Sequence, residues 1–185
     1  QRQMCIRDRS YFETDKKRVL VTCGTHLKWE KERMVERAKK LSQLYPDYLF
    51  YITLGEASGL ENAPKRLAEN LLLFDYLPYT DILDKIDFAI HHAGTGIMMA
   101  CIEQEIPSLI LPQDYDQFDN AVRAELAQVG LVSRRKTDAE VLRLFKELID
   151  RTDWSQLKTL AQQSKEYQPT EILYQELGRL LKLDL

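Results

Sequence analysis

The stretch that decides the fold reads F-A-I-H-H-A-G-T-G-I-M-M-A-C-I-E-Q-E-I-P-S-L-I-L-P-Q-D-Y-D-Q-F-D-N and covers residues 88–120. A short apolar run, residues 88–90, ends in two histidines and a turn of small residues, and an apolar helix-like segment follows as far as Gln104. A second apolar run, residues 109–111, ends in a polar loop. This order predicts a β-α-β unit. Ligands of open α/β sheets bind outside the carboxyl ends of the strands, so the polar residues after both strands should meet at one crevice.

The rest of the chain repeats this alternation of strand and helix. Short apolar or β-branched runs predict strands at residues 19–22, 48–54, 71–74, 88–90, 109–111 and 131–133. Helical periodicity predicts helices at residues 28–45, 64–69, 80–84, 96–104, 119–128, 137–149, 154–165 and 171–182. We expect an α/β fold, a Rossmann-like parallel sheet with helices on both faces and an all-helical C-terminal tail.

Composition excludes several classes of protein. The 185 residues are enough for one domain with a core, and both signs of charge are mixed to a formal net charge of −3. Nucleic-acid binding would need a clustered basic face, and a membrane span would need about 20 consecutive apolar residues. The sequence has neither, and it shows no signal-peptide pattern. We expect a cytoplasmic protein with no transmembrane segment, and a peripheral position at a membrane is the alternative.

The cysteines and the N-terminal residues complete this outline. Cys5, Cys23 and Cys101 lack metal-ligand spacing, and we expect Cys23 and Cys101 to be small buried hydrophobic side chains. Residues 1–15 begin with Gln and are polar without a period, so we interpret them as a disordered linker or translated adapter sequence. The remaining residues, 16–185, form the single predicted domain, which we interpret as the C-terminal part of a longer protein.

The small-residue turn is the first candidate for a binding site. Gly94 and Gly96 let a ligand approach the backbone, and the free amides at a helix start favour a phosphate, to which Thr95 adds a hydroxyl. An ordinary strand-to-helix turn is the alternative. A Walker A loop is excluded because no Lys-Ser or Lys-Thr follows, and Met99 stands where a dinucleotide fingerprint would have its third glycine.

The two histidines next to the turn should have different environments. Adjacent residues of a strand point to opposite faces, so His91 and His92 cannot easily share one metal ion. One of them is expected to face the core as a structural histidine. His92 abuts the glycine turn and is the candidate hydrogen-bond donor to an anionic ligand.

Polar residues after the other strands complete the candidate site. Asp116 and Gln117 can accept from and donate to vicinal hydroxyls, as sugar recognition requires, although surface loops contain many such residues. The candidate residues that follow strands, and so face one rim of a parallel sheet, are Gly24, Thr25, Tyr76, His92, Gly94, Thr95, Asp116 and Gln117.

These motifs together resemble the donor-binding signature of nucleotide-sugar glycosyltransferases. The resemblance is to the C-terminal domain of the two-domain GT-B architecture, the UDP-glycosyltransferase group, whose bacterial members have H-H-G-G-x-G-T, then G-V-P, then D-Q-x-x-N-A. The matching segments are residues 92–96 (HAGTG), 106–107 (IP), 112 (P) and 116–121 (DQFDNA), and residues 75–78 (DYLP) resemble the start of the plant signature. The resemblance covers roughly residues 19–132.

The resemblance implies a role for each matched position. His92 and the amides of Gly94, Thr95, Gly96 and Ile97 would hold the diphosphate, Tyr76 and Leu77 would lie against the base, and Asp116 and Gln117 would hold hydroxyls of the transferred sugar. There are two departures from the pattern. Ala93 replaces a glycine, and Ala100 stands where the plant signature has a ribose-binding Glu.

The implied function is transfer of a hexosyl group from a UDP-sugar, with inversion and without a metal or a cofactor. Amides, the helix dipole and His92 would meet the growing charge of the departing diphosphate. The resemblance assigns no catalytic residue to this chain, because the general base and the acceptor pocket belong to an N-terminal domain, and the chain alone should be inactive. The alternatives are a separate donor subunit that pairs with a membrane-anchored acceptor subunit, and a non-catalytic nucleotide-binding module.

Overall fold

The computed structural model describes residues 10–25, 27–56 and 63–181, and within them one seven-stranded sheet has the order β3-β4-β2-β1-β5-β6-β7. The strands are β1 (Lys17–Thr22), β2 (Tyr48–Thr53), β3 (Lys65–Ala68), β4 (Leu71–Phe74), β5 (Phe88–His91), β6 (Ser108–Ile110) and β7 (Gly130–Val132). Neighbouring strands are parallel except for the antiparallel pair of β3 and β4. The six parallel strands have the strand order of a Rossmann-like sheet, which confirms the predicted fold class.

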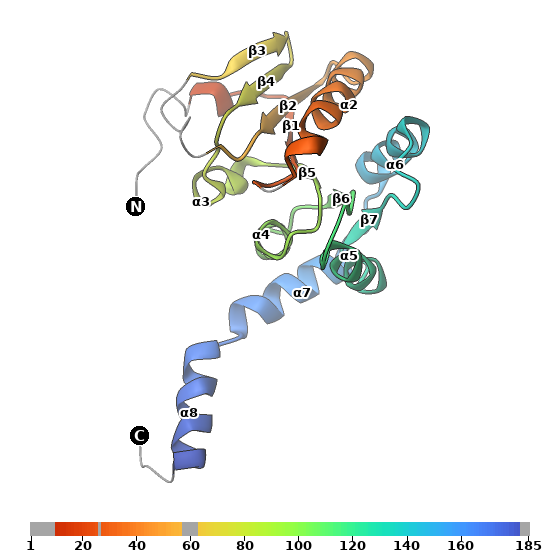
Figure 1. The fold of residues 1–185 in the computed structure, drawn as a ribbon. Coiled ribbons are helices and arrows are strands. Elements are labelled where there is room, and N and C mark those ends of the chain that lie inside the picture. Colours follow the sequence, from red (N-terminus) through yellow and green to blue (C-terminus); the bar gives the residue numbers. More distant parts are fainter. Residues whose placement is uncertain (1–9, 26, 57–62, 182–185) are drawn as a thin grey trace.

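Helices cover both faces of this sheet (Figure 1). The helices of the described residues are η1 (Ser10–Phe12), η2 (Lys28–Glu30), α2 (Lys31–Leu44), α3 (Tyr79–Ile82), η4 (Leu83–Lys85), α4 (Thr95–Glu103), α5 (Gln117–Leu126), α6 (Asp138–Asp150), α7 (Ser155–Glu166) and α8 (Pro169–Leu181). On β1, Val19 and Val21 pack into the apolar cluster beneath α2, α5 and α6, whereas Leu20 packs into the cluster beneath α3 and α4. The central strands are apolar throughout because both of their faces are buried.

The order of the strands positions the functional crevice. After β1 the chain moves to one side through β2 and β4, and it returns on the other side as β5. β1 and β5 are paired in parallel, with Val21 opposite Ile90, so their carboxyl ends lie side by side. Residues that follow Thr22 and His91 therefore meet at the switch point of the sheet, where α/β proteins bind ligands.

The prediction of a short helix at residues 64–69 is wrong. Lys65–Ala68 forms the edge strand β3, which pairs with β4. Asn70, just before β4, donates from Nδ2 to the carbonyl oxygens of Ser42, Tyr45 and Tyr48, which fixes the start of β4 against α2 and β2. Six residues are too few to stabilise a helix by propensity, so the exposed backbone edge of β4 decides the conformation. The predicted loop at residues 55–63 lies largely outside the described residues.

The packed part of the chain begins before residue 16, where the sequence analysis placed its start. The Phe12 side chain is only 2% exposed, and its ring stacks on Tyr51 with 4.5 Å between ring centroids. The Arg18 guanidinium donates to the carbonyl oxygens of Phe12 and Thr14. Residues 1–9 of the predicted linker lie outside the described part of the chain.

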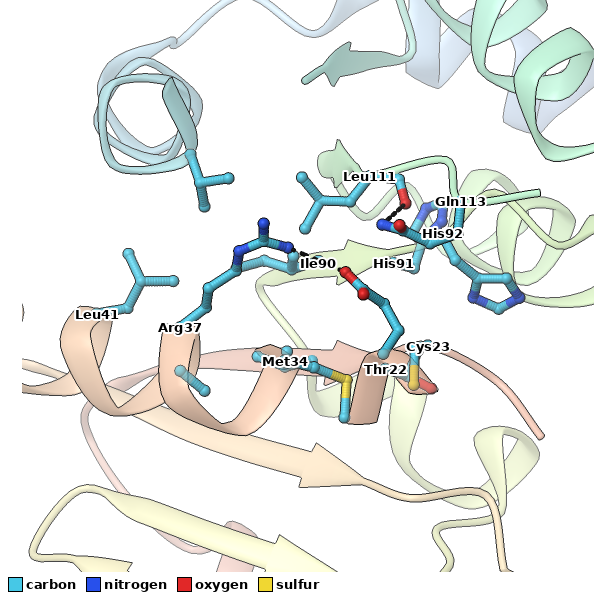
Figure 2. Close-up of a pocket in the computed structure, with 14 residues that line it drawn as sticks. Thr22, Cys23, Met34, Arg37, Leu41, Ile90, His91, His92, Leu111 and Gln113 are labelled. Carbon is cyan, nitrogen blue, oxygen red and sulfur yellow. Dashed lines mark hydrogen bonds and ion pairs between the residues drawn. The ribbon is translucent and has the colours of Figure 1, made fainter. Parts of the chain in front are cut away.

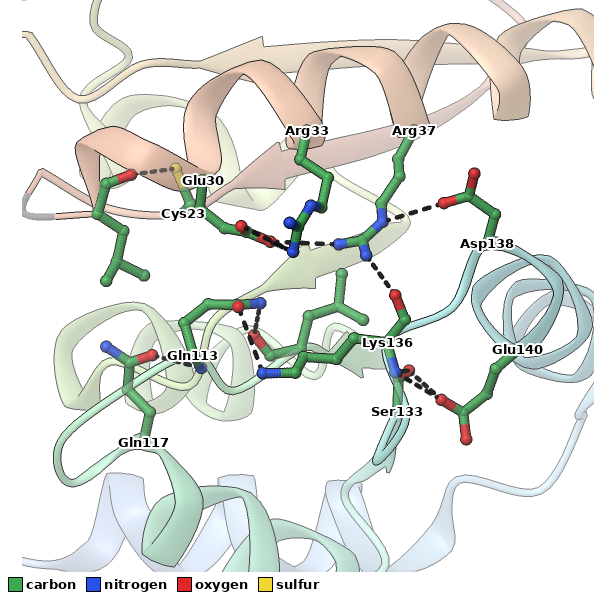
Figure 3. Close-up of polar contacts among 12 residues, drawn as sticks. Cys23, Glu30, Arg33, Arg37, Gln113, Gln117, Ser133, Lys136, Asp138 and Glu140 are labelled. Atoms are coloured by element: carbon green, nitrogen blue, oxygen red, sulfur yellow. Dashed lines mark hydrogen bonds and ion pairs between the residues drawn. The ribbon is translucent and has the colours of Figure 1, made fainter.

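Polar contacts join α2 to the N-terminus of α6 on one face of the sheet (Figure 3). The buried Arg37 guanidinium contacts the Glu30 carboxylate at 3.5 Å and the Asp138 carboxylate at 3.5 Å, and it donates to the carbonyl oxygen of Lys136. Arg37 on α2 thus connects η2 with α6. Removing either Arg37 or Glu30 would leave the other charge buried without its partner, which is strongly destabilising.

The C-terminal tail is helical, as predicted. α7 packs on α4, and α8 extends away from the sheet with most of its side chains exposed (Figure 1). None of the helices that the structure describes has the length and apolar content to cross a membrane. Cys23 and Cys101 are free and buried, as predicted, and Cys5 lies outside the described residues.

Candidate functional site

A pocket of about 560 Å³ opens at the carboxyl ends of β1, β5 and β6, and we call it the switch-point pocket. Its volume lies in the range of small-molecule sites, about 300–1,000 Å³. The lining residues are Cys23, Gly24, Thr25, Leu27, Trp29, Tyr79, His92, Gly94, Thr95, Gly96, Ile97, Tyr115, Asp116 and Gln117. The fold thus brings together all the predicted site residues except Tyr76 and Leu77.

The imidazole of His92 lies between two glycines. A Cβ atom added to Gly24 would come within 2.7 Å of His92 Cε1, and one added to Gly94 would come within 2.5 Å of His92 Nε2. Gly24 also has a φ of 73°, which side chains other than glycine rarely adopt. The two glycines follow β1 and β5. Because neither has a side chain, the imidazole fits between them at the switch point.

The turn between His92 and α4 presents backbone amides to the pocket. Gly94 is the N-cap residue of α4 and has no side chain that could accept a hydrogen bond from the first amides of this helix. The amides of Thr95, Gly96 and Ile97 have no acceptor within the helix, and the helix dipole gives this end a partial positive charge. Since no Lys or Arg is among the described residues that line the pocket, an anionic ligand there would be stabilised by these amides and by His92.

Asp116 is tied to the turn by hydrogen bonds. Its Oδ2 atom accepts from the Thr95 hydroxyl at 3.4 Å and from Asn120 Nδ2 at 3.0 Å. Asn120 Nδ2 also donates to the carbonyl oxygen of Ala93 at 3.0 Å. Asn120 is a site residue that the candidate list omitted, although it occupies the fifth position of the matched D-Q-x-x-N-A motif. Asp116 keeps a second carboxylate oxygen for a ligand.

Gln117 has a structural task in addition to its place in the lining (Figure 3). Its Oε1 atom accepts from the amides of Gln113 at 2.9 Å and Asp114 at 3.2 Å, and its side chain is buried. The loop that these bonds close includes Tyr115 with a φ of 53°. Gln117 therefore shapes the loop, and only its Nε2 donors remain for a ligand hydroxyl.

Neither Tyr76 nor Leu77, which the resemblance places against the base, lines the switch-point pocket. Leu77 is buried in the core and its amide donates to the Thr53 hydroxyl, so its side chain does not reach the pocket. Tyr76 is also absent from the lining, and its contact with a base stays a prediction. Tyr79 lines the pocket instead, and its hydroxyl shares a 3.0 Å hydrogen bond with the Thr22 hydroxyl. Burial raises the pKa of Tyr79 to about 12, so its phenol keeps its proton.

Two exposed aromatic side chains at the pocket were not in the sequence-based list. Trp29 of η2 is 62% exposed and Tyr115 of the loop after β6 is 73% exposed. Neither belongs to a motif, and Trp29 lies in a charged segment that reads as the solvent-facing start of a helix. Their exposure at a pocket becomes visible only in the folded chain.

His91 faces the interior, as the alternation along a strand predicts for one of the two histidines. Its side chain is 1% exposed and lines a second pocket of about 30 Å³ between α2 and the sheet, which we call the inner pocket (Figure 2). Its Nδ1 atom accepts from the Ala93 amide at 3.1 Å. Burial is the main cause that lowers the pKa of His91 to about 3, so the ring is neutral. In the described part of the chain, no group of three or more His, Cys, Asp or Glu side chains is placed to hold a metal ion.

Known proteins resemble this chain in sequence and in fold. Residues 50–177 match the family model described as erythromycin biosynthesis protein CIII-like, C-terminal domain. The chain is 31% identical over 99 residues to a sterol 3-beta-glucosyltransferase of Komagataella phaffii, covering 54% of this chain and 8% of that protein. It is 25% identical over 134 residues to the Bacillus subtilis protein named uncharacterized UDP-glucosyltransferase YdhE, covering 71% and 34%.

A solved structure shares the fold. Spinosyn rhamnosyltransferase SpnG complexed with thymidine diphosphate superposes with a TM-score of 0.70 at 18% identity, over 89% of this chain and 46% of that chain. The chain therefore spans less than half the length of each of these three proteins.

Proposed function

The chain belongs to the family of erythromycin biosynthesis protein CIII-like C-terminal domains, and from this premise we propose that it is the donor-binding half of a glycosyltransferase. The domain binds a nucleoside-diphosphate sugar in the switch-point pocket, and a domain or subunit that holds the acceptor completes the enzyme. This agrees with the family that the sequence motifs resemble. The observation that carries the proposal is the amide-lined start of α4 beside an imidazole that two glycines hold in place.

The proposed chemistry follows from these groups. When the glycosidic bond to the diphosphate breaks, negative charge grows on the leaving group. Amide donors fixed at a helix start can stabilise that charge without reorganisation, and His92 can donate a further hydrogen bond. The Asp116 carboxylate accepts hydrogen bonds from hydroxyls of the hexosyl group, and Gln117 Nε2 donates to them. The general base comes from the acceptor-binding partner, so transfer with inversion requires both halves.

The nucleotide is proposed to be UDP. The Bacillus subtilis relative is named as a UDP-glucosyltransferase, whereas the SpnG structure holds thymidine diphosphate. The two diphosphates present the same anionic groups to the start of α4 and differ only in the nucleoside. A difference between their affinities would therefore measure the contribution of the contacts to the base and the ribose.

The domain is expected to bind UDP with the same affinity in the presence and absence of EDTA. The reason is that amides and an imidazole lie at the proposed diphosphate position and that Asp116 is the single carboxylate among the described lining residues, whereas a hard cation takes several oxygen ligands. Isothermal titration calorimetry measures the affinity, and uridine is the matched control ligand, because it keeps the base and ribose but lacks the diphosphate. Loss of UDP binding on chelation would contradict the amide account, and equal binding of uridine and UDP would place the diphosphate elsewhere.

Asp116→Ala is expected to weaken binding of a UDP-sugar while leaving the affinity for UDP nearly unchanged. A hydrogen bond between a carboxylate and a sugar hydroxyl contributes about 1.5–3 kcal/mol, which corresponds to about tenfold or more in affinity. Asp119→Ala is the matched control, since Asp119 lies in the first turn of α5, three residues after Asp116, is exposed and pairs with Arg123 outside the pocket. Equal losses for UDP and the UDP-sugar would assign Asp116 to the nucleotide.

A further inference from the structure

Ala93 adopts an unfavourable conformation at the point where the turn begins. Its φ is 68°, in the left-handed region that disfavours residues with a Cβ atom, and its side chain is fully buried. The residue directly precedes Gly94 and the first amides of α4. A residue held in this region persists only when its surroundings fix it, and such residues cluster where a backbone must be presented to a ligand.

Hydrogen bonds hold both sides of Ala93. On one side His91 Nδ1 accepts from its amide at 3.1 Å, and on the other side Asn120 Nδ2 donates to its carbonyl oxygen at 3.0 Å. Asn120 in turn donates to Asp116, so Ala93 is linked through Asn120 to the loop after β6 on the other side of the switch-point pocket. The orientation of the turn therefore depends on the two side chains that hold Ala93.

His91 brings no evident gain in stability to the core. Because its Nδ1 atom accepts from an amide and the ring is neutral, Nε2 carries the hydrogen. Nε2 is buried and has no hydrogen-bond partner among the described residues. A buried donor without a partner is unfavourable, and an apolar side chain of similar size would avoid this cost. What the imidazole supplies, and an apolar side chain cannot, is the acceptor for the Ala93 amide.

We propose that His91 is the positioning residue of the anion-binding turn: it holds Ala93 in the left-handed conformation and so aims the amides of α4 and the His92 side chain at the diphosphate. His91 itself lies in the inner pocket and does not line the switch-point pocket (Figure 2). It acts on the ligand only through the backbone. The inference rests on the proposed function, because it assigns to His91 a part in binding the donor's diphosphate.

Two variants separate positioning from a merely structural role. His91→Leu removes the acceptor, whereas the Oδ1 atom of His91→Asn can replace Nδ1 as the acceptor for the Ala93 amide. We expect His91→Leu to weaken UDP binding about tenfold, with uridine binding unchanged. The His91→Asn protein should keep a UDP affinity within about twofold of that of the unsubstituted protein. Ile90→Val, a neighbouring core substitution on β5, is the control that lowers stability without changing affinity.

The outcomes are distinct. A folded His91→Leu protein with unchanged UDP affinity, or an Asn variant as weak as the Leu variant, would overturn the positioning role. If the unsubstituted protein binds neither UDP nor thymidine diphosphate, the proposed function fails instead.

The hydrogen bond itself is measured in the unsubstituted protein, which makes the test independent of how the variants fold. Nuclear magnetic resonance is expected to detect a ¹⁵N–¹⁵N coupling between His91 Nδ1 and the Ala93 amide nitrogen, with the imidazole proton on Nε2. Saturation with UDP should strengthen the protection of the Ala93 amide against hydrogen exchange. A proton on Nδ1, or a missing coupling, would overturn the inference whatever the affinity for UDP.

Discussion

His92→Ala is expected to weaken the binding of UDP and of UDP-sugars about tenfold or more, because a hydrogen bond from the imidazole to a charged phosphate contributes about 1.5–3 kcal/mol. The ring lies half-buried in the switch-point pocket, beside the amides that start α4. The loss should be the same for both ligands, since both carry the diphosphate. Calorimetry gives the affinities, and circular dichroism with thermal unfolding shows that the variant is folded.

The ligand series provides the control for His92. Uridine has no phosphate, so its weak binding should not change in the His92→Ala variant. A loss confined to UDP-sugars would place the imidazole at the sugar rather than the diphosphate. Normal affinity for UDP in a folded variant would remove His92 from the site and leave the amides of α4 as the anion-binding groups.

The parts of the fold that the sequence predicts are those set by local periodicity. Apolar runs bounded by turns give the six parallel strands, because a strand buried on both faces must be apolar throughout. The edge strand β3 was missed because Lys65 and Arg66 face solvent and only its pairing with β4 defines it. Phe12 was missed for a related reason: Tyr11 and Phe12 are one adjacent aromatic pair in an otherwise polar segment without a period, and Tyr51, on which Phe12 stacks, lies 39 positions away from it in the chain.

The candidate site could be predicted where a polar residue or a glycine directly follows a predicted strand. The alternation along β5 separates His91 from His92, and the end of each parallel strand gives one rim. The details that the sequence does not contain are contacts between loops. Gln117 accepts from two amides of its own loop, and Tyr79 rather than Leu77 reaches the pocket, because the chain after β4 turns at Pro78 into α3. Such contacts depend on the relative placement of segments, which no periodicity records.

Gly94→Ala is expected to weaken UDP binding about tenfold or more without unfolding the domain, because the loss of a charge-assisted hydrogen bond has this size. Gly94 has a φ of −60° and a ψ of 138°, which alanine adopts without strain. The added methyl group would lie 2.5 Å from His92 Nε2, and its three nearest atoms among the described residues all belong to the imidazole. The imidazole can move, but Gly24 confines it on the other side, so it must leave its position in the pocket. Stability should stay the same or rise by about 0.4–1 kcal/mol, since alanine restricts the unfolded chain.

A double-mutant cycle shows whether the methyl group acts through His92. If displacement of the imidazole is the whole effect, Gly94→Ala should change UDP affinity by less than about twofold in the His92→Ala protein, and the two substitutions together should cost no more than His92→Ala alone. Gly24→Ala provides the comparison at the opposite wall: it also meets the imidazole, but its φ of 73° adds backbone strain, so it should lower stability as well as affinity. A Gly94→Ala effect that persists in full without the imidazole would mean that the ligand's phosphate itself lies against the Gly94 backbone, where the methyl group excludes it directly.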